Sequence, residues 1–274
     1  MLRLRELAIV ASFAMLAMTA AIGVQRQHLA ALPGTSPLSS ISAAVDPTLP
    51  HLLHVAETAP AQPGNDVADH VRAVVPSALF GYFDLYLYVS KAAAGPWAQH
   101  MYVFRRTGGD GLQFEQSFPV STGREMQEKY FTSTPAGLFE LDPGRFDRVH
   151  FSHRWHNAPM PWAMFLDYTI RSRPTGIALH SATGHLAELG HRASGGCVRM
   201  PPEKAEELFE RIQSAESGLV PVFAMNGTTT DKTGRIALDA DGAPMVVQGY
   251  KVLLIIEDEP GAPVVMATLS VSRG

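Results

Sequence analysis

Apolar and polar residues alternate along the middle of the chain in short runs bounded by turn-forming residues. These runs fall at residues 83–89, 101–104, 114–121, 138–141, 163–166, 175–180 and 219–225. They are rich in β-branched and aromatic side chains, which is typical of β-strands. The glycine-rich stretch at 108–111 predicts a hairpin turn between the second and third strands.

One segment has helical spacing instead. Prolines at 201 and 202 precede an acidic residue, and Leu208, Phe209 and Ile212 then share one helical face. Proline and acidic residues in a first turn favour a helix start, and Gly218 is expected to end this helix. Runs at 246–257 and 262–272 predict two or three further strands. Together these patterns predict a mainly β fold, a sandwich or distorted barrel, with one clear helix and extra C-terminal strands.

The first residues have the pattern of an export segment. Arg3 and Arg5 precede an almost uninterrupted apolar run from Leu7 to Val24, and a positive start followed by an apolar run is the layout of a secretory signal. The run exceeds a usual signal core of about 7–15 residues and reaches the low end of a membrane span, about 17–25 residues. Residues 1–25 are therefore expected to be either a cleaved signal peptide or a retained membrane anchor.

The rest of the chain divides into three parts by composition. Residues 26–77 are rich in Ala, Pro, Ser and Thr and show no sustained period, which predicts a flexible linker. A catalytic domain is expected at 78–225, followed by a C-terminal β extension at 226–274. The protein is expected to be exported to the periplasm or cell envelope, with a possible tether to the inner membrane.

Charge and composition exclude some functions. The chain of 274 residues is 46% hydrophobic and 18% charged, with a formal net charge of -4, as in an ordinary globular protein. It contains no dense Lys/Arg run, so nucleic acid is not an expected partner. Electrostatic attachment to an anionic membrane is not supported either.

The single cysteine, Cys197, is a candidate nucleophile. With one cysteine in the chain no intrachain disulfide can form, so this thiol is either a small buried hydrophobe or a reactive group. It lies in Ser194-Gly-Gly-Cys-Val-Arg199, just before the predicted helix. Small residues before a nucleophile let backbone N–H groups reach the carbonyl under attack, and a helix N-terminus favours a thiolate. Arg199 is placed to pair with a carboxylate of the substrate or of the protein.

A thiol also needs a base, because the thiolate is the nucleophile. His180 ends the strand at 175–180 and precedes Ser181 and a polar loop that contains glycine. That loop can return the chain to Cys197, 17 residues later. From spacing alone, His180 is either this base or a structural histidine.

These motifs resemble the YkuD family of L,D-transpeptidases. His180-Ser181 matches the family's His-Gly or His-Ser pair, and Ser194, Gly196, Cys197 and Arg199 match its Ser-His-Gly-Cys-x-Arg signature. Segments 118–123 and 134–139 are similar to two strand-and-turn segments of the family, and 160–164 resembles a wall of its substrate cleft. The similarity spans roughly residues 82 to 225.

The resemblance implies a cysteine acyltransferase acting on peptidoglycan stem peptides. Cys197 would attack the L-centre to D-alanine bond with His180 as its base, while the Ser181 backbone or side chain orients the imidazole. D-Alanine would leave, and the amine of a neighbouring stem peptide would resolve the thioester into a 3-3 cross-link. No cofactor is implied. The expected substrate-binding residues are Arg199, Ser194, Gly195, Gly196, Trp162 and Met160.

One departure from the family leaves alternatives open. Gly195 stands where the family has a histidine, which puts the rate and the preferred substrate in doubt. His191 is either a substitute for that imidazole or an exposed loop residue. Two other functions remain: an L,D-carboxypeptidase or hydrolase on the same scaffold, and a wall-binding protein that has lost catalysis.

A run of histidines raises the question of a metal site. His150, His153 and His156 recur at every third residue, whereas zinc wants three or four converging ligands. Their neighbours Trp155 and Trp162, together with Arg154, look equally like cleft lining. Structural or substrate-contact roles are therefore expected for these histidines, and no metal.

Overall fold

Two β-sheets carry the part of the chain that the computed structural model describes, residues 63–126 and 132–259. The first sheet has the order β3-β2-β1-β15-β4, with strands Gly111–Pro119, His100–Gly108, Leu85–Ser90, Val252–Glu257 and Gly137–Phe139. The second has the order β10-β9-β6-β5, with strands Val198–Met200, Ala178–Ser181, Ala158–Leu166 and Leu141–Ser152. The predicted mainly β class is confirmed, as is the hairpin between β2 and β3.

Shorter elements connect these sheets. Three small antiparallel pairs are formed by β7 with β8, β11 with β14, and β12 with β13. Their bounds are Thr169–Ile170, Arg173–Pro174, Ser217–Pro221, Val246–Tyr250, Met225–Asn226 and Thr229–Thr230. Single 3-10 turns η1, η2 and η3 lie at Ser77–Leu79, His153–Trp155 and Leu186–Glu188.

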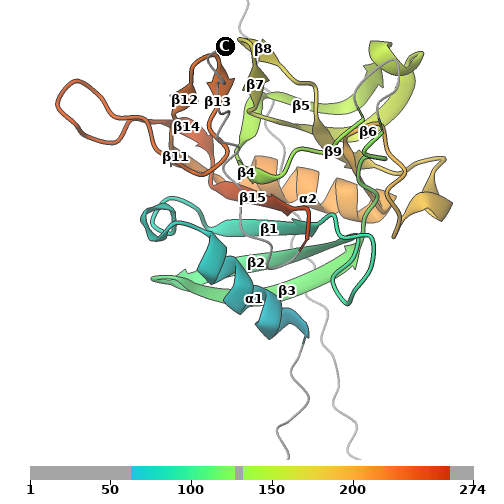
Figure 1. Ribbon diagram of the computed structural model, residues 1–274, viewed down its shortest axis with the longest axis horizontal. Coiled ribbons are helices and arrows are strands. Elements are labelled where there is room, and N and C mark those ends of the chain that lie inside the picture. Colours follow the sequence, from blue (N-terminus) through green and yellow to red (C-terminus); the bar gives the residue numbers. More distant parts are fainter. Residues whose placement is uncertain (1–62, 127–131, 260–274) are drawn as a thin grey trace, which may run out of the picture. The chain divides into compact units, whose positions relative to one another are not determined.

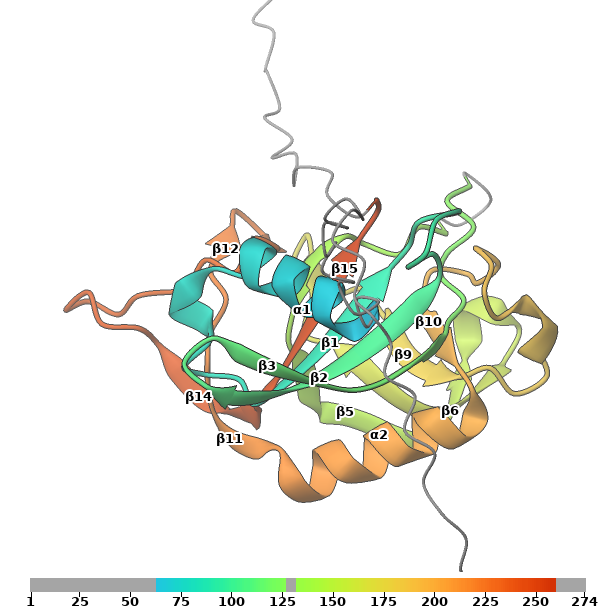
Figure 2. The same cartoon turned by 90° about the horizontal axis from the view of Figure 1, so that it is seen from below.

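The strand β1 shows why the five-stranded sheet is buried on both faces. Its residues alternate between two clusters: Leu85 and Leu87 join the main core, whereas Tyr86 and Tyr88 join a second core on the opposite face. Because successive strand side chains point to opposite faces, a strand covered on both sides is apolar throughout. Helices α1 and α2 lie on opposite sides of β1–β3 (Figure 2).

The predicted helix after Cys197 is confirmed as α2, Pro202–Ala215. Its buried residues Ala205, Leu208, Phe209 and Ile212 belong to the main core between the two sheets. The helix ends before Gly218, which lies in β11 and not at the helix terminus.

A second helix, α1, lies where the sequence predicted flexible linker. It spans Pro63–Val74 and packs against β2 and β3 (Figure 1). Val67, Val71 and Val75 recur every fourth residue and are buried in the second core, which is the apolar stripe of an amphipathic helix. This helix was not predicted from the sequence, because its apolar stripe is short and directly follows a segment rich in Ala and Pro. The folded unit thus begins before residue 78.

The expected C-terminal extension also contains a central strand. β15 pairs in parallel with β1 and antiparallel with β4, so it lies inside the five-stranded sheet. All six of its residues are buried. A boundary at 225 therefore divides one sheet and does not separate two structural units. The strand predicted at 262–272 lies outside the described residues.

The export segment predicted at residues 1–25 also lies outside the described residues. Within the described ranges, no helix is both long enough and apolar enough to span a bilayer.

Glu140 is a buried carboxyl between β4 and β5. It is 7% exposed, and its Oε1 has no hydrogen-bond partner within the described part of the chain. Burial and the neighbouring Asp167 raise its pKa from 4.5 to about 8, against a backbone hydrogen bond from Phe223. Glu140 is therefore protonated at neutral pH in the folded protein.

This buried carboxyl predicts a pH-dependent stability. A raised folded-state pKa means that folding binds the proton, so stability should fall as pH rises from about 4.5 to 8, by about 1.4 kcal/mol per pH unit. Glu140→Gln should flatten this slope and exceed the wild type in stability at pH 8, as measured by urea unfolding from pH 5 to 8.5. Exposed Glu203→Gln is the control, and an unchanged slope in Glu140→Gln would contradict the assignment.

Candidate active site

Cys197 and His180 project from the same face of the four-stranded sheet. Strands β9 and β10 run in parallel, with Arg199 opposite His180. Leu179 and Val198 point into the main core, so the residues next to them in each strand face away from it. A cavity of about 190 Å³ lies on this outer face and contains both Cys197 and His180 in its wall. We call it the His180 cavity.

His180 is held in one orientation by its neighbour's backbone. Its Nδ1 lies 2.8 Å from the carbonyl oxygen of Ser181. A carbonyl only accepts, so Nδ1 carries the proton and Nε2 presents a lone pair. The Ser181 hydroxyl instead lies 2.7 Å from that of Thr183. Of the two groups expected to orient the imidazole, the backbone carbonyl is the one in contact.

The environment keeps the imidazole neutral. Burial, followed by the positive charge of Arg199, lowers the pKa of His180 to about 4, although the Ser181 carbonyl opposes this shift. His185 and His150 add to the lowering. The neutral base form of His180 is therefore present throughout the physiological pH range.

The thiol is also neutral at rest. Burial raises the pKa of Cys197 above its ordinary value, opposed by a hydrogen bond from the Ala178 backbone and by the charges of Arg199 and Arg154. The thiol donates to the carbonyl oxygen of Gly176 at 3.8 Å, and not to His180. The resting pair is thus a thiol, hydrogen bonded to Gly176, and a neutral imidazole.

The loop before Cys197 is fixed by a neighbouring segment. Ser194 is fully buried; its hydroxyl donates to the Cys197 carbonyl at 2.5 Å and accepts from the Gly196 N–H at 3.1 Å. Gly196 has a φ of +118°, and a Cβ there would meet Ile177 and the Ser133 carbonyl at 3.2 Å. Ser194 and Gly196 therefore shape the loop, and their substrate contacts stay a prediction.

Segment 121–124 forms the other side of this loop. Ser121 and Arg199 exchange two backbone hydrogen bonds of 2.9 Å, and the Arg124 N–H donates to the Ser194 carbonyl at 3.1 Å. The buried Thr134 hydroxyl accepts from the Gly123 N–H at 2.7 Å and donates to the Gly196 carbonyl at 2.8 Å. The backbone around Cys197 is thereby bonded to two separate segments.

Arg199 is paired within the protein. Its guanidinium donates to Glu188, which also lies 2.9 Å from Nδ1 of His185. His185 and Arg199 both line the His180 cavity. A substrate carboxylate at Arg199 would therefore share it with Glu188.

A second cavity of about 180 Å³ meets the first at Cys197. Cys197, Gly195, Met160 and Trp155 line both cavities. The second cavity also includes Arg145, and we call it the Arg145 cavity. Met160, Gly195 and Trp155 thus lie beside Cys197 in the walls of both cavities, and the substrate-binding roles of Met160 and Gly195 stay predictions.

Trp155 closes over Gly195. A Cβ at residue 195 would lie 2.8 Å from two ring carbons of the indole. The indole is presented by a tight turn in which His156 and Asn157 have positive φ values of 54° and 58°. The Asn157 N–H donates to the Ser152 carbonyl at 3.0 Å, which closes this turn. Any side chain at 195 would displace the indole.

Trp162, in contrast, is placed away from Cys197. Its ring packs against Phe209 of α2 at 5.4 Å between centroids, and it lines neither of the two cavities. Its φ of +58° lies in the left-handed region and interrupts the alternation of β6. As a result, Met160 and Ala163 face the cleft side while Trp162 points to the helix. The expected role of Trp162 as cleft lining does not match this position.

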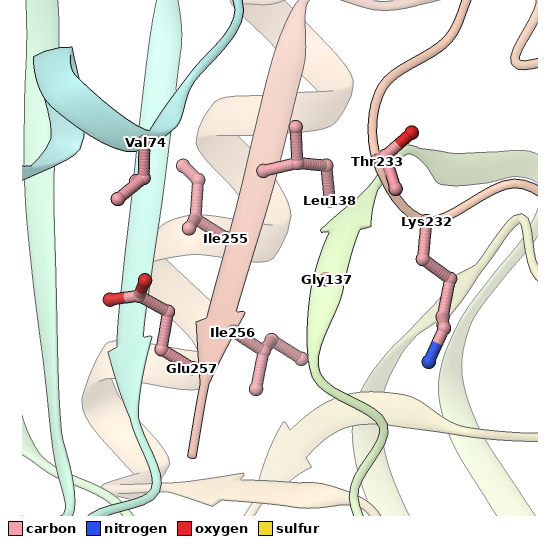
Figure 3. Close-up of a pocket in the computed structure, with 8 residues that line it drawn as sticks. All are labelled: Val74, Gly137, Leu138, Lys232, Thr233, Ile255, Ile256 and Glu257. Atoms are coloured by element: carbon pink, nitrogen blue, oxygen red, sulfur yellow. The ribbon is translucent and has the colours of Figure 1, made fainter. Parts of the chain in front are cut away.

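A third cavity lies apart from this chemistry. It measures about 310 Å³ and is lined by Val74, Gly137, Leu138, Lys232, Thr233, Ile255, Ile256 and Glu257 (Figure 3). Neither Cys197 nor His180 reaches it. Oε2 of Glu257 already accepts from Tyr88 at 2.8 Å and contacts His70 at 2.5 Å. The volume of a cavity therefore does not identify the candidate active site in this protein.

The histidine run does not form a metal site with other ligands. Within residues 63–126 and 132–259, no three His, Cys, Asp or Glu side chains converge as metal ligands. Nδ1 of His150 lies 3.3 Å from Asp147, and Nδ1 of His153 lies 2.9 Å from Asn157. His191 is exposed and lines neither cavity at Cys197.

Comparison with known proteins identifies the family. A model of the L,D-transpeptidase catalytic domain, YkuD, matches residues 87–265, which is more than half of the chain. The chain belongs to the L,D-transpeptidase catalytic-domain family. The match extends through β15, as expected for a strand inside the sheet.

Solved L,D-transpeptidases are among the structures that this chain matches. One determined in complex with imipenem is 15% identical with a TM-score of 0.38, over 64% of this chain and 59% of that chain. Those from Mycobacterium smegmatis and Mycobacterium tuberculosis are 15% and 17% identical, each with a TM-score of 0.36 over 64% of this chain and 59% and 58% of theirs. The chain thus covers less than two thirds of their length. No curated protein matches the sequence.

Within this family, the Trp155–Gly195 contact explains how the departure from the Ser-His-Gly-Cys signature is accommodated. The space beside the loop backbone, which a side chain at 195 would enter, holds the indole ring. Trp155 therefore covers Gly195, the position at which the family's signature has a histidine. Cys197 and His180, the residues that match the family's motifs, are both present.

Proposed function

We propose that this protein is a cysteine acyltransferase, an L,D-transpeptidase that acts on peptidoglycan stem peptides. One observation carries the proposal. Cys197 and His180 line the same cavity, and the Ser181 carbonyl holds the imidazole with Nε2 available as a base. Both groups are neutral at rest, so His180 acts as a general base and not as one half of a preformed ion pair.

The first step forms a thioester. The thiol turns from the Gly176 carbonyl, Nε2 of His180 takes its proton, and the sulfur attacks the carbonyl of the L-centre to D-alanine bond. His180 returns the proton to the departing amine, so D-alanine leaves and a thioester to Cys197 remains. The developing oxyanion needs backbone donors. The Gly196 N–H is bound to Ser194, which leaves the N–H groups of Gly195 and Cys197 for this role.

The second step joins two stem peptides. The amine of a neighbouring peptide's diamino acid attacks the thioester, His180 takes its proton, and the thiol is released as the 3-3 cross-link forms. Two cavities meeting at Cys197 support a reaction with two peptides, because an acyl donor and an acceptor must approach one sulfur. Water as the acceptor would instead make the protein an L,D-carboxypeptidase.

The site of action follows from the substrate. Stem peptides lie in the cell envelope, so we propose that the apolar run after Arg5 directs export, either as a signal peptide or as an anchor.

Mass spectrometry of the intact protein incubated with a stem tetrapeptide tests the proposal. We expect an adduct equal to the peptide without its D-alanine, located on the peptide that contains Cys197 after digestion. An adduct on another residue, or the absence of both an adduct and released D-alanine, would reject catalysis at Cys197 and favour a wall-binding protein. Adding an acceptor peptide then separates the two outcomes of the thioester: dimers indicate a transpeptidase, and tripeptides a hydrolase.

A further inference from the structure

The wall of the Arg145 cavity contains two arginines and no acidic residue. Its lining includes Arg145, Arg154, His150 and His153, and neither Asp nor Glu is part of it. The His180 cavity also has no Asp or Glu in its lining, but its Arg199 is already paired with Glu188. The two cavities therefore offer different electrostatic environments to a peptide bound at Cys197.

The ring of Phe165 orients Arg145 in this wall. Its guanidinium carbon lies 4.0 Å from the centre of the Phe165 ring, a cation–π contact that orients the planar group. The described residues supply it with no hydrogen bond or ion pair, and its Nη1 is buried without a partner. Asp167 is near enough for Arg145 to lower its pKa, although burial and Asp142 raise that pKa more. A buried guanidinium nitrogen without an acceptor is costly, and a bound anion would remove that cost.

The cavity leads from Arg145 to the sulfur. Gly176 and Ile177 line it together with Cys197, and the resting thiol donates toward Gly176 on this side. Phe165 belongs to the apolar cluster on the outer face of the sheet against which Cys197 packs. A peptide whose carbonyl is attacked by Cys197 can therefore reach the guanidinium with a carboxylate near the reacting bond.

We propose that Arg145 anchors a free carboxylate of the stem peptide and so selects acidic over amidated substrates. This inference rests on the proposed function. The shared chemistry is a carboxylate, from either the terminal residue that leaves or the side chain of the diamino acid. Arg145 acts as a binding residue, since a planar guanidinium can donate two parallel hydrogen bonds to a carboxylate.

Acylation kinetics with three tetrapeptides test this role. One peptide has both carboxylates free, one has a terminal amide, and one has an amide on the diamino acid side chain. We expect kcat/KM for the free acid to exceed that of one of the two amides by about 10-fold to 100-fold, as for a hydrogen bond to a charged group. The amide that is disfavoured identifies the carboxylate that is bound.

Arg145→Gln should bring that ratio close to one by lowering the rate with the free acid, while the rate with the disfavoured amide stays unchanged. Arg145→Lys, which keeps the charge without the planar fork, should retain part of the preference. Arg148→Gln is the matched control, because Arg148 lies on the same strand but pairs with Glu210 and stacks on Trp162.

Several results would overturn the inference. Wild-type protein that accepts all three peptides equally, or an Arg145→Gln variant that slows with acid and amide alike, would remove the selective role. If no peptide forms a thioester, the proposed function fails instead. Dissociation constants of the acid and the amides for the Cys197→Ala protein then decide the inference, and equal constants would reject it.

Discussion

Replacing His180 by Gln is expected to slow thioester formation at Cys197 by about 10²-fold to 10⁴-fold, the usual contribution of a general base. The glutamine amide N–H can still donate to the Ser181 carbonyl, so the loop should keep its structure. It cannot take a proton from the thiol, and burial holds that thiol in its neutral form. The rate of D-alanine release from a stem tetrapeptide measures the effect, with Cys197→Ala as the blank.

The pH profile distinguishes loss of the base from a general disturbance. Because burial and Arg199 lower the pKa of His180 to about 4, the base is neutral above that pH. The wild-type rate should therefore stay level from about pH 5 upward and fall only near pH 4, whereas His180→Gln should lose this acid limb. His185→Gln, in the same cavity but exposed, should keep it. A wild-type limb near pH 6.5, the ordinary value for histidine, would contradict the neutral-pair assignment.

The sequence was sufficient to predict the strands and the helix next to the site. The period-2 runs at 83–89 and 114–121 became β1 and β3, and the spacing of Leu208, Phe209 and Ile212 became the buried face of α2. These segments have long or regular patterns, and tertiary packing uses the same faces that the patterns define.

Two elements were not placed correctly because their role depends on distant partners. β15 has an apolar sequence that fits any buried strand, and only its pairing with β1 and β4 makes it central. α1 has a short apolar stripe, and only its packing against one face of the sheet identifies that stripe as part of the core. A local pattern carries no information on which other segment will lie beside it.

In the candidate site, too, some residues could be predicted from the sequence and others could not. Cys197 and His180 could be proposed because the chain has a single cysteine, and because both residues stand in the order of the family's motifs. Trp162 was expected in the cleft, but its left-handed backbone turns it toward α2, and composition does not reveal a backbone dihedral angle. Arg145 carries no sequence signal, since its proposed role follows from a buried Nη1 that has no hydrogen-bond partner among the described residues.

Gly123→Ala is expected to damage both the fold and the reaction. A Cβ at this position would lie 2.1 Å from the Thr132 carbonyl oxygen and 2.7 Å from the Thr134 nitrogen. Both are backbone atoms that cannot turn aside, so the two segments must separate. Forcing extra volume into a packed site costs about 1–3 kcal/mol and occasionally more, which should appear as a lower midpoint in urea unfolding.

The rate should fall further than the stability loss alone explains. The segment that would move is bonded to the nucleophile loop through the Arg124 N–H and the Thr134 hydroxyl. A shift of about 1 Å in the position of a reacting group can cost about 10²-fold in rate, so we expect a loss of that order in folded Gly123→Ala protein. Gly81→Ala is the matched control, because no atom lies within 4 Å of the added Cβ. Wild-type acylation by a folded Gly123→Ala variant would show that segment 121–124 does not position Cys197.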